Sequence, residues 1–311
     1  MSDLTTAVRP AALRPGDRVM LVSPSGPTRP DRVARGVELL SGWGLSVTVA
    51  PNAYARSGYL AGADELRLAD LMTALGDPAV RGVICTRGGY GVQRIVDGID
   101  MAVVRADPKI VVGFSDITAL QLSLWRGARL ASVHGPGAAW LHERTGPDSV
   151  AALRHALMEP TPVVISARQD EETSPVRVSA PPVSGPLLGG NLCLLTASIG
   201  TPDFPDLTGA ILLIEEVAEP PYKVDRMLTH LRRAGVLSRV AGVAVGQFTD
   251  CADNRSTTIV DCLLEGLAPL GVPVLGGLPI GHGRDQIAVP FGTVATLDAT
   301  AGTLTVAPAV R

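Results

Sequence analysis

The sequence predicts an α/β protein with a parallel sheet in its first half and an α+β domain with a curled, barrel-like sheet in its second. Three observations indicate this. In the first half, short apolar runs alternate with segments of helical spacing, which is typical of a parallel sheet flanked by helices. A proline-rich stretch interrupts this pattern at residues 160–186. Short β-rich segments follow it.

The first half contains apolar, β-branched runs that suit buried strands. Strands are expected at residues 18–23, 45–49, 80–86, 110–112 and 130–133. Helices are expected at residues 31–40, 64–75, from about 92, from 116 onward and at 149–158. Ligands bind beyond the C-terminal ends of strands in such sheets, so the loops after Ser23, Thr86 and Phe114 should share one rim.

The proline-rich stretch also carries a charged run at residues 168–172, and both features are typical of a linker. The predicted organisation is an N-terminal domain (1–160), a linker that could hold one or two short strands (161–184) and a C-terminal domain (185–311). In the last, helices are expected to start at residues 189–191 and to span 224–234. Strands are expected at 210–214, 240–245, 272–275, 286–290, 293–297 and 303–306.

The composition excludes several classes of protein. The 311 residues are 46% hydrophobic, with a net charge of −3, no basic block and 4% aromatic residues, so no nucleic-acid partner is expected. No apolar run reaches membrane-spanning length and the N-terminus lacks a signal core, so we expect a cytoplasmic protein without a membrane partner. The four cysteines form no C-x-x-C pair, and motifs for metals or nucleotides are absent, so no metal or cofactor is expected.

Ser115 lies in the turn between a predicted strand and a predicted helix. A hydroxyl at such a turn is pushed out of the sheet edge, next to unpaired N–H groups at the helix N-terminus, which suits a nucleophile. The esterase pattern G-x-S-x-G fails, however, because Ile117 stands at its last position. An ordinary role for Ser115 as a helix N-cap is the commoner alternative.

A serine nucleophile needs a base, and a base needs a carboxylate to orient it. His282, between two glycines, is the first candidate, and His134, at the end of a strand, is the second. The other histidines are expected at the surface: His142, His155 and His230. Glu215 and Glu216 end a buried strand and should point to opposite faces, so only one can join the site. Both could equally be solvated charges.

The loop at residues 87–91, R-G-G-Y-G, follows another predicted strand. It lacks the third glycine of a dinucleotide fingerprint, because Arg94 stands there. A Gly-Gly turn in this place can instead expose a backbone N–H for an oxyanion hole.

Several stretches together resemble the LD-carboxypeptidases, or muramoyltetrapeptide carboxypeptidases. They occur in the family's order along nearly the whole chain: L-R-P-G-D-R (13–18), V-S-P-S-G (22–26), Y-L-A-G (59–62), R-G-G-Y-G (87–91), G-F-S-D-I-T (113–118), G-P-L-L-G-G-N (185–191), I-E-E-V-A-E-P-P-Y-K-V-D-R (214–226) and G-H-G (281–283). One departure is Glu216, where many members have Asp, and the family pattern selects the first acid of the pair.

The resemblance implies a triad of Ser115 as nucleophile, His282 as base and Glu215 as its orienter. It also implies oxyanion-hole donors from the backbone N–H groups of Gly89 and Asp116. The implied fold is an amidotransferase-like N-terminal domain with a barrel-like C-terminal domain, often in a homodimer.

The implied activity is removal of the terminal D-Ala from murein tetrapeptide, or a related small peptide, in cell-wall recycling. The candidates for substrate contacts are Arg87, Tyr90 and Asn191. The alternative is a serine peptidase like the microcin C immunity proteins, which cleave aminoacyl-nucleotide conjugates. Residues 160–186 contain no Trp, Tyr or Phe to stack on a base, which counts against this alternative. A non-catalytic binding protein on the same fold ranks lowest, because all three triad residues are present.

Overall fold

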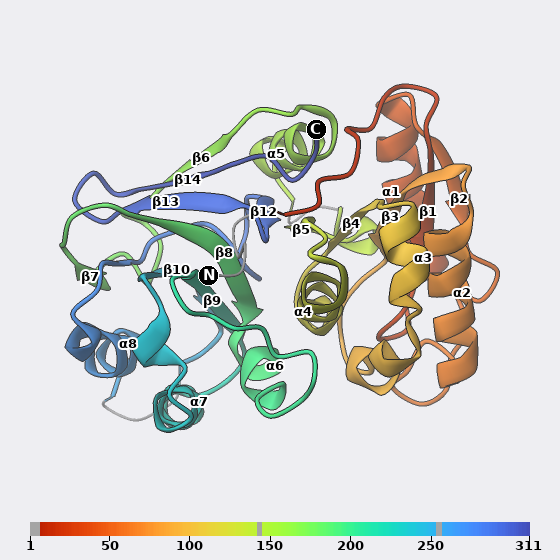
Figure 1. Cartoon of the computed structure of the whole chain (residues 1–311). Helices are drawn as coiled ribbons and strands as arrows, with labels where there is room; N and C mark the ends of the chain where they lie inside the picture. The colour runs from red at the N-terminus through yellow and green to blue at the C-terminus, as the bar shows by residue number, and fades with distance from the viewer. Residues whose placement is uncertain (1–6, 142–144, 253–256) are drawn as a thin grey trace.

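The structure is a computed structural model that describes residues 7–141, 145–252 and 257–311. Its first half forms the predicted parallel sheet (Figure 1). Five strands are parallel: β1 (Arg18–Val22), β2 (Ser46–Val49), β3 (Val80–Cys85), β4 (Ile110–Gly113) and β5 (Ser132–His134). A sixth, β12 (Val289–Phe291), comes from the second half of the chain and pairs antiparallel with β5. A strand was expected at residues 286–290, but in the sheet of the second domain rather than in this one.

Helices cover both faces of this sheet because successive residues of its buried strands point to opposite sides. On one face Met20 and Val22 of β1 join a core with α2 (Asp64–Gly76), α3 (Met101–Ala106) and α4 (Ile117–Ala128). On the other, Val19 and Leu21 join a core with α1 (Pro30–Gly42) and α5 (Pro147–Met158). The predicted helices at 31–40, 64–75, 116 onward and 149–158 are therefore confirmed, with slightly different ends.

The helix predicted from about Val92 is wrong. The segment forms two short 3₁₀ turns, η1 (Val92–Arg94) and η2 (Val96–Gly98), and α3 begins only at Met101. Its start is set by Asp100, whose carboxylate accepts a hydrogen bond from the Ala102 N–H. Gly98, the last residue of η2, disfavours a continuous helix from Val92 into α3.

The second sheet has eight strands and curls around an apolar core. Their order is β6 (Val163–Ser166), β14 (Thr303–Val306), β13 (Val294–Asp298), β8 (Val183–Asn191), β9 (Ile211–Val217), β10 (Gly242–Thr249), β11 (Val274–Leu275) and β7 (Arg177–Val178). The segment predicted as a linker, 161–184, thus supplies β6, β7 and the start of β8 to this sheet.

Three helices cover the other face of the curled sheet: α6 (Leu192–Ala197), α7 (Pro221–Arg233) and α8 (Ile259–Leu267). The sequence did not predict α8. Its start carries a capping box, in which Thr258 and Asp261 each accept a hydrogen bond from the other's backbone N–H. Within the described parts of the chain, no helix is long and apolar enough to span a membrane.

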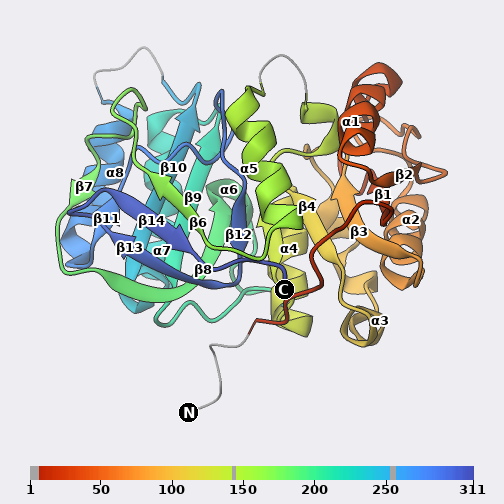
Figure 2. The same ribbon diagram turned by 90° about the horizontal axis from the view of Figure 1, so that it is seen from above.

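The two sheets meet along α4, which lies between them together with α5 (Figure 2). At this junction the backbone N–H of Asn191, at the end of β8, donates to Thr118 Oγ1 on α4 at 3.1 Å. Glycine is required in β8 just before this point, because a Cβ on Gly189 would lie 2.0 Å from the Leu213 carbonyl oxygen. The ends of β8 and β9 therefore lie close to the start of α4.

Candidate active site

Ser115 connects β4 to α4 with a left-handed backbone, at φ 66°. A non-glycine residue in this conformation is strained, and such residues often occur at active sites. The N-cap of α4 is Asp116, and the Ser115 hydroxyl makes no hydrogen bond to any residue in the described ranges. The alternative role of Ser115 as a helix cap therefore does not hold.

Two glycine-rich loops pack closely around Ser115. A Cβ on Gly88 would lie 2.7 Å from Ser115 Cβ, so only glycine allows this approach. The next residue, Gly89, has φ +130°, which also requires glycine, and it packs on Gly26. In the described parts of the chain, neither the Gly89 nor the Asp116 backbone N–H donates to another backbone carbonyl. Both remain available to a ligand.

A buried arginine holds these two loops together. Arg67 on α2 is 1% exposed, and its Nη1 donates to the Pro24 carbonyl and, at 2.9 Å, to the Gly91 carbonyl. Its other Nη is paired with Asp64. Sequence reasoning missed Arg67, although it shares the apolar face of its helix with Leu71 and Ala74. A charged residue in that face was the available signal.

Asp116 also links the segments that follow β1 and β3. Its Oδ2 accepts hydrogen bonds from Ser25 Oγ at 2.6 Å and from the Val92 N–H at 3.0 Å. Burial raises the pKa of this carboxyl, although the two hydrogen bonds partly oppose the shift. The residue after Ser115 thus contacts both rim loops through its side chain.

Glu215 and His282 form a buried hydrogen-bonded pair. Nδ1 of His282 lies 2.6 Å from Oε2 of Glu215, which is fully buried. Burial opposes the charge on His282, but the charge and hydrogen bond of Glu215 outweigh it and raise the pKa of His282. Burial likewise opposes ionisation of Glu215, but His282 keeps its pKa below the usual value. Both shifts favour an ion pair.

The loop before His282 allows this contact. Gly281 has φ +137°, and a Cβ there would lie 3.0 Å from Glu215 Oε2. The imidazole also packs against the Phe114 ring, with centroids 4.7 Å apart. Since Phe114 precedes Ser115, the structure brings the three predicted triad residues into one neighbourhood from β4, β9 and the loop before β12.

Glu216 points away from His282, as strand alternation predicts. Its Oε1 accepts from Asn191 Nδ2 at 2.9 Å, and its Oε2 accepts from the Cys193 N–H at 2.8 Å. Burial raises the pKa of Glu216 to about 7. The pair Asn191–Glu216 therefore anchors the start of α6, and the Asn191 side chain is already occupied.

The remaining candidates lie in different settings. Arg87 and Tyr90 are exposed, and the Tyr90 ring contacts Tyr59 with centroids 5.4 Å apart. His134, the second choice as base, is fully buried beside Phe114, with ring centroids 6.2 Å apart, and burial lowers its pKa to about 4. Of the histidines predicted at the surface, His230 is exposed, His155 is half-buried, and His142 lies outside the described residues.

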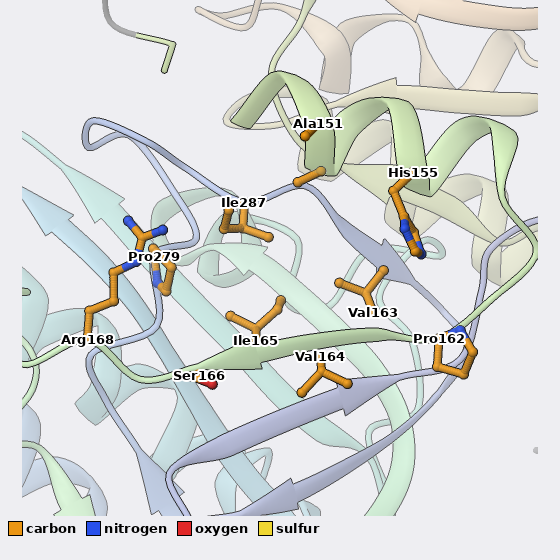
Figure 3. Close-up of a pocket in the computed structure, with 11 residues that line it drawn as sticks. Ala151, His155, Pro162, Val163, Val164, Ile165, Ser166, Arg168, Pro279 and Ile287 are labelled. Carbon is orange, nitrogen blue, oxygen red and sulfur yellow. The ribbon is translucent and has the colours of Figure 1, made fainter. Parts of the chain in front are cut away.

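Two pockets matter for the location of a site. One, of about 460 Å³, lies between α5 and β6 and is lined mainly by apolar residues such as Val163, Ile165 and Ile287 (Figure 3). None of the predicted site residues lines it. Another, of about 510 Å³, is lined by Arg87 and by Trp140, whose ring lies 6.1 Å from that of His282.

Among the described residues, no group of three or more His, Cys, Asp or Glu could hold a metal.

Solved structures show the same architecture. A muramoyltetrapeptide carboxypeptidase from Oxalobacter formigenes superposes with a TM-score of 0.83 and 28% identity, over 94% of this chain and 100% of that one. The microcin C7 self immunity protein in its wild-type form gives a TM-score of 0.88 at 21% identity, over 98% and 100% of the two chains. At that identity the second likeness shows the fold alone.

Sequence comparison adds the family. A putative carboxypeptidase of Streptomyces coelicolor is 42% identical over 96% of each chain. A murein tetrapeptide carboxypeptidase of Pseudomonas aeruginosa is 30% identical over 90% of this chain and 93% of its own. The LD-carboxypeptidase N-terminal domain matches residues 19–135, and the LD-carboxypeptidase C-terminal domain matches residues 184–297. The chain therefore belongs to the LD-carboxypeptidase family, the family that its motifs resemble.

Proposed function

We propose that the protein is a serine-type LD-carboxypeptidase that removes the terminal D-Ala from murein tetrapeptide in cell-wall recycling. The observation that carries this proposal is the buried His282–Glu215 hydrogen bond of 2.6 Å, packed against the residue before Ser115. The relative of P. aeruginosa named as a murein tetrapeptide carboxypeptidase supports the substrate.

The proposed reaction begins when Ser115 Oγ attacks the carbonyl carbon before D-Ala. Because Nδ1 of His282 faces Glu215, Nε2 is the nitrogen that takes the serine proton. The developing oxyanion is stabilised by the N–H groups of Gly89 and Asp116. Nε2 then gives the proton to the amine of D-Ala as the C–N bond breaks. In the second half of the reaction, water attacks the acyl-enzyme while Nε2 takes its proton, and Nε2 returns that proton to Ser115 Oγ as the ester bond breaks.

Substrate contacts follow from the surroundings of this site. The terminal carboxylate of the peptide needs a positive or N–H-rich partner, because an unpaired buried carboxylate is costly. Of the three predicted contacts, Arg87 and Tyr90 have exposed side chains, whereas Asn191 is engaged with Glu216. Arg87 and Tyr90 are therefore the better supported candidates for direct contact.

The proposal includes a cytoplasmic location and a homodimer. All four cysteines are free thiols, which agrees with a reducing compartment. The dimer rests on the family resemblance, and sedimentation of the purified protein tests it directly.

A parallel assay tests the proposed activity. Purified protein and Ser115→Ala would be incubated with murein tetrapeptide and with an aminoacyl-adenylate analogue, and the products identified by mass spectrometry. We expect release of D-Ala by the wild type alone. Hydrolysis of the adenylate analogue without release of D-Ala would contradict the tetrapeptide assignment and favour the immunity-type activity.

A further inference from the structure

Beside the proposed triad lies the pocket of about 510 Å³ whose lining includes Trp140, and the Trp140 ring lies 6.1 Å from that of His282. Its walls come from the loop after β1 with the start of α1, from the loop after β2, from the loop after β3 and from the turn η3 (Ala138–Trp140). Its charged and aromatic lining residues are Arg29, Arg32, Arg56, Arg87, Tyr54 and Trp140. Arginines from three separate loops thus meet in one cavity.

The positive charges of these arginines differ in whether a carboxylate balances them. Arg29 is held by Asp31 through two hydrogen bonds of 2.9 and 2.8 Å, so its charge is balanced. No carboxylate within residues 7–141, 145–252 and 257–311 pairs with Arg32, Arg56 or Arg87. Arg32 and Arg87 line the same pocket, and the pKa of Arg87 is lowered first by burial and then by the positive charge of Arg32. An anion between them would relieve this repulsion.

Two residues that line the pocket, Trp140 and Arg87, lie next to the groups that the proposed reaction uses. Trp140 contacts the rings of both Phe114, at 5.2 Å between centroids, and His282. Arg87 precedes Gly88, which packs on the Ser115 side chain. A cavity of this size suits a ligand of many atoms, and a single D-Ala would leave most of it empty. The larger, non-leaving part of a substrate is therefore the better occupant.

We infer that this pocket binds an anionic group carried by the non-leaving part of the substrate, and that Arg32 and Arg56 provide its cationic contacts. The inference rests on the proposed function and adds a specificity determinant to it. In a murein peptide the matching group is the free α-carboxylate of the γ-linked glutamate. Planar guanidinium groups suit carboxylates and phosphates alike, so a phosphate is the competing anion.

Binding to the inactive variant Ser115→Ala, measured by titration calorimetry, tests the inference without relying on turnover. The ligands are the tetrapeptide with a free glutamate α-carboxylate, the same peptide with that group amidated, and an aminoacyl-adenylate analogue. We expect the acid to bind about tenfold more tightly than the amide, or more, as for hydrogen bonds to charged groups. The difference should shrink at high salt, because the pocket is open to solvent.

Arg32→Gln and Arg56→Gln, each added to Ser115→Ala, should abolish the preference for the acid. Arg35→Gln is the matched control, since Arg35 is an exposed arginine of α1 that does not line the pocket. In otherwise wild-type enzyme, both pocket variants should raise KM for the acid with little change in kcat.

Equal affinity for acid and amide would overturn the inference, and so would an equal effect of Arg35→Gln. If only the adenylate analogue depends on Arg32 and Arg56, the anion is a phosphate and the carboxylate assignment is wrong. Failure of the proposed function looks different, because the wild-type enzyme would then release no D-Ala from either peptide.

Discussion

Oε2 of Glu215 and Nδ1 of His282 are 2.6 Å apart in a region from which water is nearly excluded, with exposures of 0% and 8%. The hydrogen bond orients the imidazole ring and leaves Nε2 as the nitrogen that would transfer the proton in the proposed reaction. Weak screening in the buried site makes the Glu215 charge an effective partner for a protonated imidazole. The consequences for rate, pH dependence and stability can each be measured.

Two replacements of Ser115 distinguish its proposed role as nucleophile from the effect of its left-handed backbone on stability. Ser115→Ala should lower kcat/KM by several powers of ten while the protein stays folded. Ser115→Gly should be equally inactive but more stable than Ser115→Ala by about 1 kcal/mol, because glycine tolerates φ 66° without strain. Urea unfolding and assays on tetrapeptide measure both effects. Substantial turnover by either clean preparation would refute a nucleophilic role.

The two adjacent glutamates should respond differently to the same change. Glu215→Gln should reduce kcat by orders of magnitude, since an amide favours the wrong imidazole tautomer. Glu216→Gln should cost much less rate, because Glu216 binds Asn191 and the Cys193 N–H rather than His282. Steady-state kinetics on tetrapeptide compare the two. Losses of similar size would mean that another group orients His282.

Glu215 and Glu216 were both candidates from the sequence because a carboxylate at the end of an apolar run is expected at a sheet rim, and the family resemblance selected Glu215. His282 ranked first among the histidines because no apolar face requires a histidine between two glycines. Both signals are local. The contact of His282 with the Phe114 ring depends on how two distant segments pack, and no local pattern reports that.

The same limit explains the errors in the fold. The segment V-S-G-P-L-L-G-G-N was not predicted as a strand, and residues 189–191 were expected to begin a helix. It forms the central strand β8, with the helix starting only at Leu192, because its glycines allow the close approach of β9. Addition of β12 to the first sheet is a long-range pairing set by the packing of the two halves. Arg67 was missed because the Pro24 and Gly91 carbonyls that accept its hydrogen bonds come together only in the folded protein.

The pH profile should report the His282–Glu215 pair. Only the neutral imidazole can accept the Ser115 proton, so kcat/KM should rise with pH through a pKa above the ordinary 6.5 of histidine. In Glu215→Gln the charge is removed while burial remains, so the residual activity should show a lower midpoint. An unchanged midpoint in this variant would show that Glu215 does not set the pKa.

Glu216 should make the folded protein less stable as the pH rises. Its pKa is raised to about 7 in the folded state, against 4.5 ordinarily, so between these values the folded protein binds more protons than the unfolded chain. The free energy of unfolding should therefore fall from about pH 4.5 to about pH 7 through this group. Glu216→Gln should flatten that decline in urea unfolding series. An identical slope in both proteins would mean that Glu216 titrates normally.

Asp116 offers a test of how the loops around Ser115 are held. Its Oδ2 alone accepts both hydrogen bonds, from Ser25 and from the Val92 N–H. Asparagine can place its carbonyl oxygen at the same point, and burial already disfavours the charge, so Asp116→Asn should keep most of the activity. Asp116→Ala leaves two buried donors without an acceptor, at a cost of about 1–3 kcal/mol each.

We therefore expect Asp116→Ala to lower both thermal stability and kcat, with a smaller effect on KM, because the loop that carries Gly89 loses its anchor. The two variants share the same backbone N–H at position 116, so a difference between them isolates the side chain. Calorimetry and steady-state kinetics on tetrapeptide measure the effects. If Asp116→Asn were as impaired as Asp116→Ala, the negative charge itself would be required and the positioning role would be wrong.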